Sequence, residues 1–237
     1  MASLLSFVIE NPLLSPVRLA AWSVLTKILA RKDLAIVAVD NVPERASTYR
    51  LIRQTRQETS MVLLDSEAFS ICAQVRGTAK VPGDIAELGV YRGGSARLIC
   101  EEKGARSLHL FDTFDGLPEA TEWDPKFRKG GFASSLDQVQ GYLQRFPRVH
   151  YHKGLFPGTA HGLDDLSFSF VHLDVDLYQS TLSGLEWFYP RLNRGGVLIS
   201  HDYTIAKGVR KAFDEFFLDK PECLIELSDS QVAFVKL

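Results

Sequence analysis

Residues 87–95 read Glu-Leu-Gly-Val-Tyr-Arg-Gly-Gly-Ser, and this stretch decides the fold. It closes a predicted strand and opens a helical pattern. Gly89 lacks a Cβ where the chain must turn, and Gly93 and Gly94 leave the helix N-terminus open to a polar or negatively charged group. The spacing from Gly89 to Gly93 matches neither the dinucleotide motif GxGxxG nor a phosphate loop that ends in Gly-Lys-Ser/Thr. The stretch therefore predicts a strand, a ligand-binding turn and a helix.

The pattern around this turn alternates strands and helices from Pro82 onwards, whereas it is helical up to about Thr78. Such alternation indicates parallel strands joined by crossover helices. Only three residues separate the last two predicted strands, which must form an antiparallel hairpin at one edge. The prediction is a Rossmann-like α/β fold with a seven-stranded, mostly parallel sheet and an antiparallel last strand. Strands are expected at 84–88, 107–111, 149–152, 168–173, 197–200, 223–227 and 231–235, and helices at 93–103, 134–146, 181–192 and 208–218.

Two parts are expected along the chain, a helical N-terminal extension at 1–80 and a ligand-binding domain at 81–237. A length of 237 residues, 46% of them hydrophobic, suffices for one large α/β core. The extension is interpreted as an interface or lid segment, which predicts a homo-oligomer. Its stretch 17–30 is charged and shorter than the ~20 residues of a membrane span, so it should pack on the core or at an interface, with contact to a membrane surface as the alternative. Residues 33–40 fit a short strand or a helix end.

Composition limits the partners and the compartment. A formal net charge of −2 provides no basic field for a nucleic acid partner. The N-terminal apolar run carries no positive leader and is interrupted by Glu10, which argues against a signal peptide. Cys72, Cys100 and Cys223 have neither metal-site nor disulfide-framework spacing, which indicates a reducing compartment. We therefore expect a cytoplasmic protein without stable membrane insertion.

Asp112 ends the second predicted strand, about twenty residues after the glycine turn. In open α/β sheets the ligand lies beyond the C-terminal ends of the strands. A carboxylate at this place can accept both ribose hydroxyls of an adenosine cofactor, whether a dinucleotide or S-adenosylmethionine. Asp112 is therefore the predicted ribose ligand.

Two further strand ends bring Asp174 and Asp176 to the same edge as His201 and Asp202. Repulsion among three carboxylates is costly without a cation, so we expect a divalent metal on Asp174, His201 and Asp202. Carboxylate oxygens suit magnesium, whereas an imidazole ligand shifts the preference towards manganese, iron or zinc. The alternative is that these acids cap helices or bind the methionine ammonium group of the cofactor.

Five ordered segments of this chain resemble the macrocin O-methyltransferase (TylF) family. The resemblance implies a class I fold and a magnesium-assisted, S-adenosylmethionine-dependent O-methyltransferase that acts on a hydroxyl of a sugar attached to a natural product. Where family members usually carry a pair of acids before Tyr203, this chain has His201 and Asp202. The segments are 83–96 (GDIAELGVYRGGSA), 109–120 (HLFDTFDGLPEA), 170–181 (FVHLDVDLYQST), 194–203 (RGGVLISHDY) and 207–217 (KGVRKAFDEFF).

The resemblance also implies a set of cofactor contacts. Met61 falls where the family closes over the cofactor, Asp112 would bind the ribose, and Asp174 matches a metal-ligand position beside the cofactor. The methionine part would lie against Glu87, Gly89 and Tyr91, and Gly94 and Ser95 at the helix start are also expected to bind the cofactor. The adenine region would comprise Ser134, Ser135, Gly154, Leu155 and Phe156.

Asp176 is the first candidate for the general base, because it leaves the same strand end as Asp174. His172 or His201 is the second candidate. If His201 does not bind metal it could itself be the base, since the ordinary pKa of histidine suits neutral pH. His172 is expected to point into the sheet, because strands alternate their faces and its neighbours are apolar.

The long connection 113–133 is interpreted as a lid over a small-molecule acceptor that carries a hydroxyl group, with a disordered surface loop as the alternative. The predicted function is O-methylation of a sugar or another small natural product. Two alternatives remain. A nicotinamide-dependent oxidoreductase would share the strand, turn and acid, although the missing GxGxxG and the final hairpin count against it. A non-catalytic S-adenosylmethionine-binding scaffold is kept open by His201.

Overall fold

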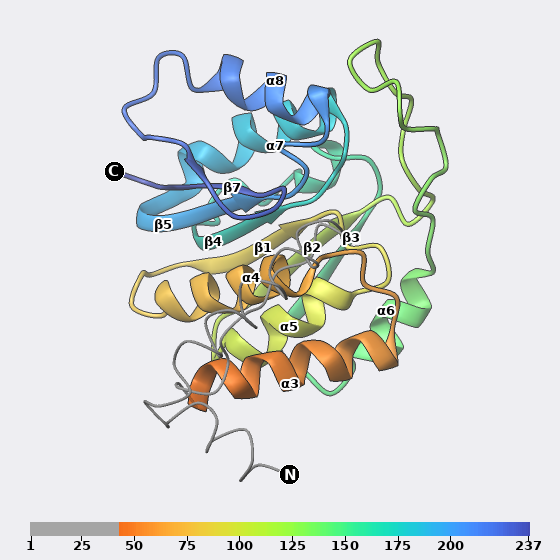
Figure 1. Ribbon diagram of the computed structural model, residues 1–237, viewed down its shortest axis with the longest axis vertical. Helices are drawn as coiled ribbons and strands as arrows, with labels where there is room; N and C mark the ends of the chain where they lie inside the picture. Colours follow the sequence, from red (N-terminus) through yellow and green to blue (C-terminus); the bar gives the residue numbers. More distant parts are fainter. Residues whose placement is uncertain (1–42) are drawn as a thin grey trace, which may run out of the picture. The chain divides into compact units, whose positions relative to one another are not determined.

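The computed structural model of this chain describes residues 43–237 (Figure 1). The expectations for the stretches 17–30 and 33–40 lie outside the described residues. Within residues 43–237, no helix combines the length and the apolar character that crossing a membrane demands.

Two compact units divide the chain, Met1–Ala46 and Ser47–Leu237, and the second contains the sheet. Helix α4 (Asp65–Gly77) belongs to this second unit, whereas the sequence patterns placed the start of the ligand-binding domain at residue 81. The site described below lies within Ser47–Leu237.

One sheet contains seven strands, namely β1 (Asp84–Leu88), β2 (Leu108–Asp112), β3 (Val149–Lys153), β4 (Phe168–Leu173), β5 (Leu192–Ser200), β6 (Ile225–Glu226) and β7 (Val232–Val235). Their order is β3-β2-β1-β4-β5-β7-β6. Strands β1 to β5 are parallel, whereas β7 runs antiparallel to β5 and β6. The predicted Rossmann-like sheet with an antiparallel last strand is confirmed. The order reverses between β1 and β4, and open α/β sheets bind ligands at such a switch point.

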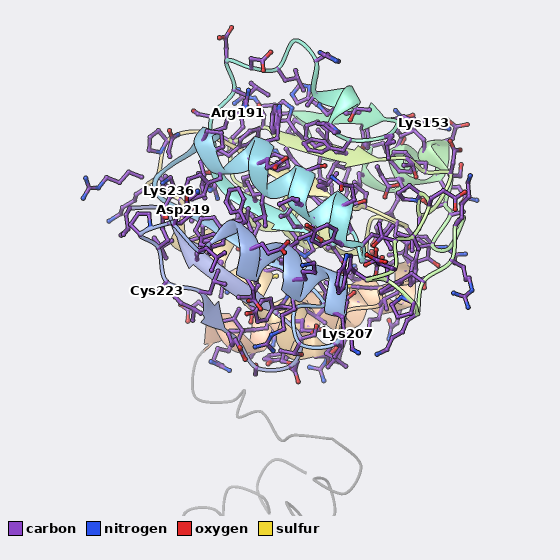
Figure 2. All side chains as sticks on the ribbon, turned by 90° about the horizontal axis from the view of Figure 1, so that it is seen from above. Lys153, Arg191, Lys207, Asp219, Cys223 and Lys236 are labelled. Atoms are coloured by element: carbon purple, nitrogen blue, oxygen red, sulfur yellow. The ribbon has the colours of Figure 1, made fainter. Side chains whose placement is uncertain are left out.

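The helices pack on both faces of this sheet. Figure 1 shows α4 and α5 on one side and α7 and α8 on the other. Seen from above in Figure 2, α7 and α8 lie side by side, with Lys207 at the start of α8. Because both faces are covered, β1 and β4 are buried almost throughout, and ligands can approach the strands only at their ends. The helices besides α4 are α3 (Pro43–Glu58), α5 (Gly94–Glu102), α6 (Leu136–Leu143), α7 (Tyr178–Phe188) and α8 (Lys207–Phe216).

Helix α7 begins at Tyr178, three residues before the position that the sequence patterns predict. The reason is a cap from a distant loop, because the Asp124 carboxylate accepts a hydrogen bond from the Tyr178 backbone N–H at 2.9 Å. After Phe188 the chain continues as a single 3₁₀ turn that contains Pro190, which has no N–H with which to extend the α-helix. Strand β5 then begins at Leu192 rather than at residue 197.

Candidate active site at the carboxyl edge of the sheet

At Gly89, the end of β1 lies in close contact with the end of β4. Its φ of 92° lies in the left-handed region, and a Cβ at this position would lie 1.8 Å from the backbone oxygen of Asp174. The Asp174 backbone N–H in turn donates to the Leu88 carbonyl at 2.9 Å. Glycine is therefore required because another strand end crosses directly beside the turn. This contact fixes the acidic end of β4 against the predicted cofactor turn.

Asp112, at the end of β2, stabilises the same turn through hydrogen bonds. One carboxylate oxygen accepts hydrogen bonds from the backbone N–H groups of Val90 (2.7 Å) and Tyr91 (2.8 Å), and the other accepts from Phe114 (2.7 Å). Tyr91 has a φ of 50°, so this carboxylate stabilises an otherwise unfavourable backbone conformation. A carboxylate offers about four acceptor sites, which leaves capacity for a ribose hydroxyl. The sequence predicted a ligand role for Asp112 but not this structural one.

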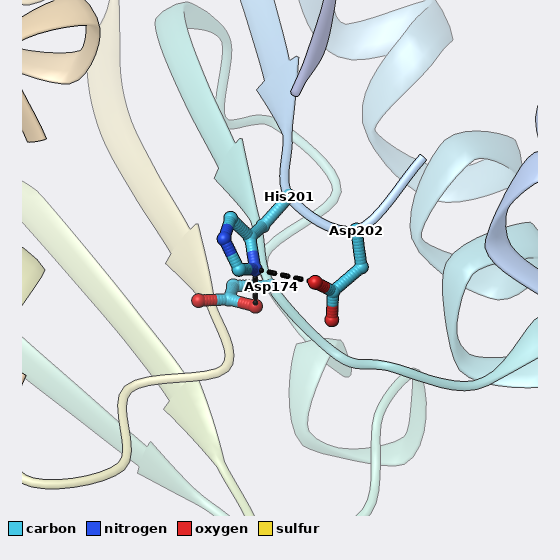
Figure 3. A group of neighbouring side chains, drawn as sticks. All are labelled: Asp174, His201 and Asp202. Carbon is cyan, nitrogen blue, oxygen red and sulfur yellow. Dashed lines mark ion pairs between the residues drawn. The ribbon is translucent and has the colours of Figure 1, made fainter. Parts of the chain in front are cut away.

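The predicted metal ligands Asp174, His201 and Asp202 meet beyond β4 and β5 (Figure 3). One ligand atom from each lies within 4.8 Å of the others. The His201 Nδ1 atom lies 3.3 Å from Asp174 Oδ1 and 2.9 Å from Asp202 Oδ1. The opposite nitrogen, Nε2, lies 3.1 Å from an oxygen of Glu67 on α4. One nitrogen and two carboxylate oxygens thus converge, and the far side of the imidazole is held by a carboxylate, as in many metal sites. The residues fit a divalent cation.

The charges of this cluster shift the pKa values of its members. Burial alone would lower the pKa of His201, but Asp174, Asp202 and Glu67 raise it well above its ordinary value. Burial and the neighbouring carboxylates of Asp174 and Asp202 raise the pKa of Asp176 to about 9. In this arrangement His201 is a protonated donor, so its candidacy as general base is not supported. Asp176 stays the predicted general base, and its pKa must fall below about 9 for it to accept a proton at neutral pH.

The sequence matches the family described as Macrocin-O-methyltransferase (TylF) over residues 64–226. The chain belongs to this family. The solved O-methyltransferase NovP superposes on it with a TM-score of 0.68 at 24% identity, over 79% of this chain and 88% of that one. The class I methyltransferase fold is thereby confirmed.

Two curated relatives carry more specific descriptions. The chain is 35% identical to the 8-demethyl-8-(2,3-dimethoxy-α-L-rhamnosyl)-tetracenomycin-C 4'-O-methyltransferase of Streptomyces olivaceus over 142 residues, which are 53% of this chain and 54% of that protein. It is 27% identical to the demethyldecarbamoylnovobiocin O-methyltransferase of Streptomyces niveus over 203 residues, 75% of this chain and 77% of that protein. The match therefore spans about half the length of the first relative and about three quarters of the second.

Glu87 and His172 of this TylF-family chain form a fully buried pair at the centre of the sheet. The His172 Nδ1 atom lies 2.8 Å from Glu87 Oε1, and neither side chain is exposed. Burial raises the pKa of Glu87. His172 points into the sheet as expected, and its burial removes it from the candidates for general base. Among the described residues, the second Glu87 oxygen finds no hydrogen-bond partner, which is a costly state for a buried polar atom.

Met61 and the start of α5 lie together beside the turn. A Cβ on Gly94 would lie 2.8 Å from the Cβ of Met61, so the two backbones approach closely. Arg56 fixes this approach by donating to the Met61 carbonyl at 3.0 Å. Ser95, the next residue of α5, is buried. The structure therefore places Met61, Gly94 and Ser95 next to one another, as the resemblance implies.

Five residues are expected around the adenine, and Phe156 differs from the other four in its surroundings. Ser134 donates to the Tyr91 carbonyl at 2.6 Å, and Ser134 and Ser135 line a cavity of about 600 Å³ beside the turn. The Gly154 N–H donates to the Asp112 carbonyl at 2.9 Å, and Leu155 is exposed. Phe156 instead packs its ring against the rings of Phe111 and Phe188. Its ring is therefore part of the aromatic core, which the resemblance did not indicate.

The predicted lid, residues 113–133, is anchored at its middle by Asp124. This side chain is 2% exposed, and besides capping α7 it accepts a hydrogen bond from the Thr121 hydroxyl at 2.6 Å. A Cβ on Gly208 would lie 1.9 Å from Oδ1 of Asp124. The predicted lid therefore also packs closely against the start of α8. Trp123 lies under the Lys211 ammonium group, 4.4 Å from the ring centre. The segment has specific contacts, which favours the lid over the disordered loop.

Proposed function

We propose that this chain transfers a methyl group from S-adenosylmethionine to a hydroxyl of a sugar or another small natural product, with the help of a divalent cation. The observation that carries the proposal is the contact between Gly89 and the Asp174 carbonyl. It brings a cofactor turn of the class I fold against an acidic cluster that fits a cation. The names of the two curated relatives support the acceptor class, since both are O-methyltransferases and the first name includes a rhamnosyl group.

Asp174, His201 and Asp202 would hold the cation. When bound, the cation would lower the pKa of a coordinated acceptor hydroxyl and offset the negative charge that raises the pKa of Asp176. The two carboxylates favour magnesium, whereas the added imidazole shifts the preference towards manganese, iron or zinc.

The chain's own residues orient the reactants and remove one proton. The turn at 87–95, with Met61 and Asp112, would position the sulfonium methyl group so that the acceptor oxygen can attack it in line. When bound, S-adenosylmethionine would supply the methyl group, its S–CH₃ bond breaking as the O–CH₃ bond forms, and Asp176 would accept the hydroxyl proton. The products are a methyl ether and S-adenosylhomocysteine. The lid anchored by Asp124 would cover the acceptor and exclude water.

We also infer that the protein acts on small molecules in the cytoplasm and forms a homo-oligomer. Support for the compartment comes from Cys72, Cys100 and Cys223, which are all free thiols. The small net charge of −2 supports a small-molecule acceptor rather than nucleic acid. The expectation of an oligomer rests on the helical pattern of the N-terminal extension.

Cofactor binding can be tested by calorimetry with S-adenosylhomocysteine. We expect saturable binding to the parent chain and about 10- to 100-fold weaker binding to Asp112→Asn, because a carboxylate that accepts from a hydroxyl and from backbone donors is replaced by an amide. Asp115→Asn is the matched control, since that carboxylate lies in the same segment with its side chain 80% exposed. Its affinity should equal that of the parent. Heat from NAD but none from S-adenosylhomocysteine would contradict the proposal and favour the oxidoreductase.

A further inference from the structure

Glu67 is a buried carboxylic acid on α4, and it contacts His201 of the active-site cluster. It is 2% exposed, and its Oε1 atom accepts hydrogen bonds from the Ser230 backbone N–H (3.1 Å) and hydroxyl (2.5 Å). Its Oε2 atom accepts from the Leu64 N–H at 2.7 Å and lies 3.1 Å from His201 Nε2. Both oxygens are therefore held in place. Because backbone N–H groups and a hydroxyl donate to both oxygens, Glu67 acts in this cluster as a hydrogen-bond acceptor.

The position of Glu67 determines which nitrogen of His201 carries a proton. A carboxylate 3.1 Å from Nε2 requires a proton on that nitrogen. Without a cation, Asp174 and Asp202 hold a second proton on Nδ1, and a bound cation would displace that proton and take the lone pair of Nδ1. That atom is the one directed at Asp174 and Asp202, at 3.3 and 2.9 Å. Histidines that bind metals through one nitrogen commonly donate the other N–H to a carboxylate.

We propose that Glu67 is a positioning residue that fixes the Nε2–H tautomer of His201 and so makes Nδ1 the third ligand of a divalent cation. The inference rests on the proposed function, because it concerns the cation of that same site. Glu67 comes from α4 and Ser230 from the loop before β7, so two elements outside the strand ends orient the ligand. The consequence is a site with one nitrogen and two oxygen ligands, a donor set that manganese, iron and zinc accept.

The test is the affinity for Mn²⁺, measured by electron paramagnetic resonance in the presence of S-adenosylhomocysteine. Glu67→Gln is expected to bind Mn²⁺ about 10- to 100-fold more weakly than the parent chain. Glu222→Gln is the matched control, since Glu222 is also a buried carboxylate, but it pairs with Lys236 and Tyr189. Its Mn²⁺ affinity should stay unchanged. Equal affinity of the parent and Glu67→Gln would overturn the role of Glu67 and leave the proposed function intact.

A second measurement needs no variant and covers the case in which Glu67→Gln does not fold. Nitrogen-15 NMR of histidine-labelled parent chain, loaded with diamagnetic Mg²⁺, should show a proton on His201 Nε2 and none on Nδ1. A proton on Nδ1 in the Mg²⁺-loaded protein would overturn the proposal. If the parent chain binds S-adenosylhomocysteine but neither ion, the cation part of the proposed function fails, and the inference fails with it.

Discussion

Replacing Asp176 by asparagine is expected to lower kcat for methyl transfer by about 10²- to 10⁴-fold, the usual contribution of a general base. Asp176 follows the metal-ligand candidate Asp174 by two residues and shares a hydrogen bond with Asp202. Its φ of 61° is a conformation that asparagine also tolerates, so the backbone should be unchanged. The measurement is single-turnover transfer to an acceptor that the parent chain methylates, followed by mass spectrometry.

This experiment must distinguish an effect on cofactor binding from an effect on the chemical step. Affinity for S-adenosylhomocysteine should be the same in Asp176→Asn and in the parent, because the proton acceptor takes part only in the chemical step. Asp219→Asn, at an exposed carboxylate outside both the cluster and the lid, should keep both the affinity and the rate. A full rate in Asp176→Asn would show that another group accepts the proton.

Replacing Gly89 by alanine is expected to lower the free energy of unfolding by on the order of 4 kcal/mol. The new Cβ would lie 1.8 Å from the Asp174 carbonyl oxygen, at a φ of 92° that alanine rarely adopts. Backbone atoms cannot move aside as the end of a flexible side chain can, so the end of β1 and the end of β4 must separate. Urea unfolding at equilibrium measures the loss.

Gly104→Ala is the matched control for this loss. Gly104 also has a positive φ, 61°, but a Cβ there would meet nothing within 4 Å. Conformational strain alone should therefore cost about 1–2 kcal/mol in this variant. The difference between the two variants isolates the close approach of the two strand ends. Equal losses would mean that the turn and the acidic cluster are not rigidly joined.

The strands of the sheet and their parallel or antiparallel sense could be predicted from the sequence because they depend on local patterns. Alternating apolar strands and amphipathic helices fix the parallel part, and the short link before β7 requires a hairpin. The start of α7 could not be predicted, since its cap is Asp124, which lies 54 residues earlier in the chain. Tertiary contacts of this kind leave no signal at the helix itself.

The candidate site also contains residues that could be predicted from the sequence and residues that could not. Acids at strand ends converge wherever the sheet is parallel, so Asp174, His201 and Asp202 could be grouped before any contact was known. Glu67 was missed because an acid in the first turn of a helix ordinarily signals only favourable placement in the helix dipole. His172 and Glu87 also needed the structure, since only the register of β1 against β4 places them opposite each other.

The most direct test of the central claim is a crystal structure with S-adenosylhomocysteine and Mn²⁺, recorded with the anomalous signal of manganese. We expect the cofactor along residues 87–95, with its ribose at Asp112, and a manganese peak between Asp174, His201 and Asp202. A cofactor bound away from this turn, or manganese bound away from these three side chains, would contradict the account.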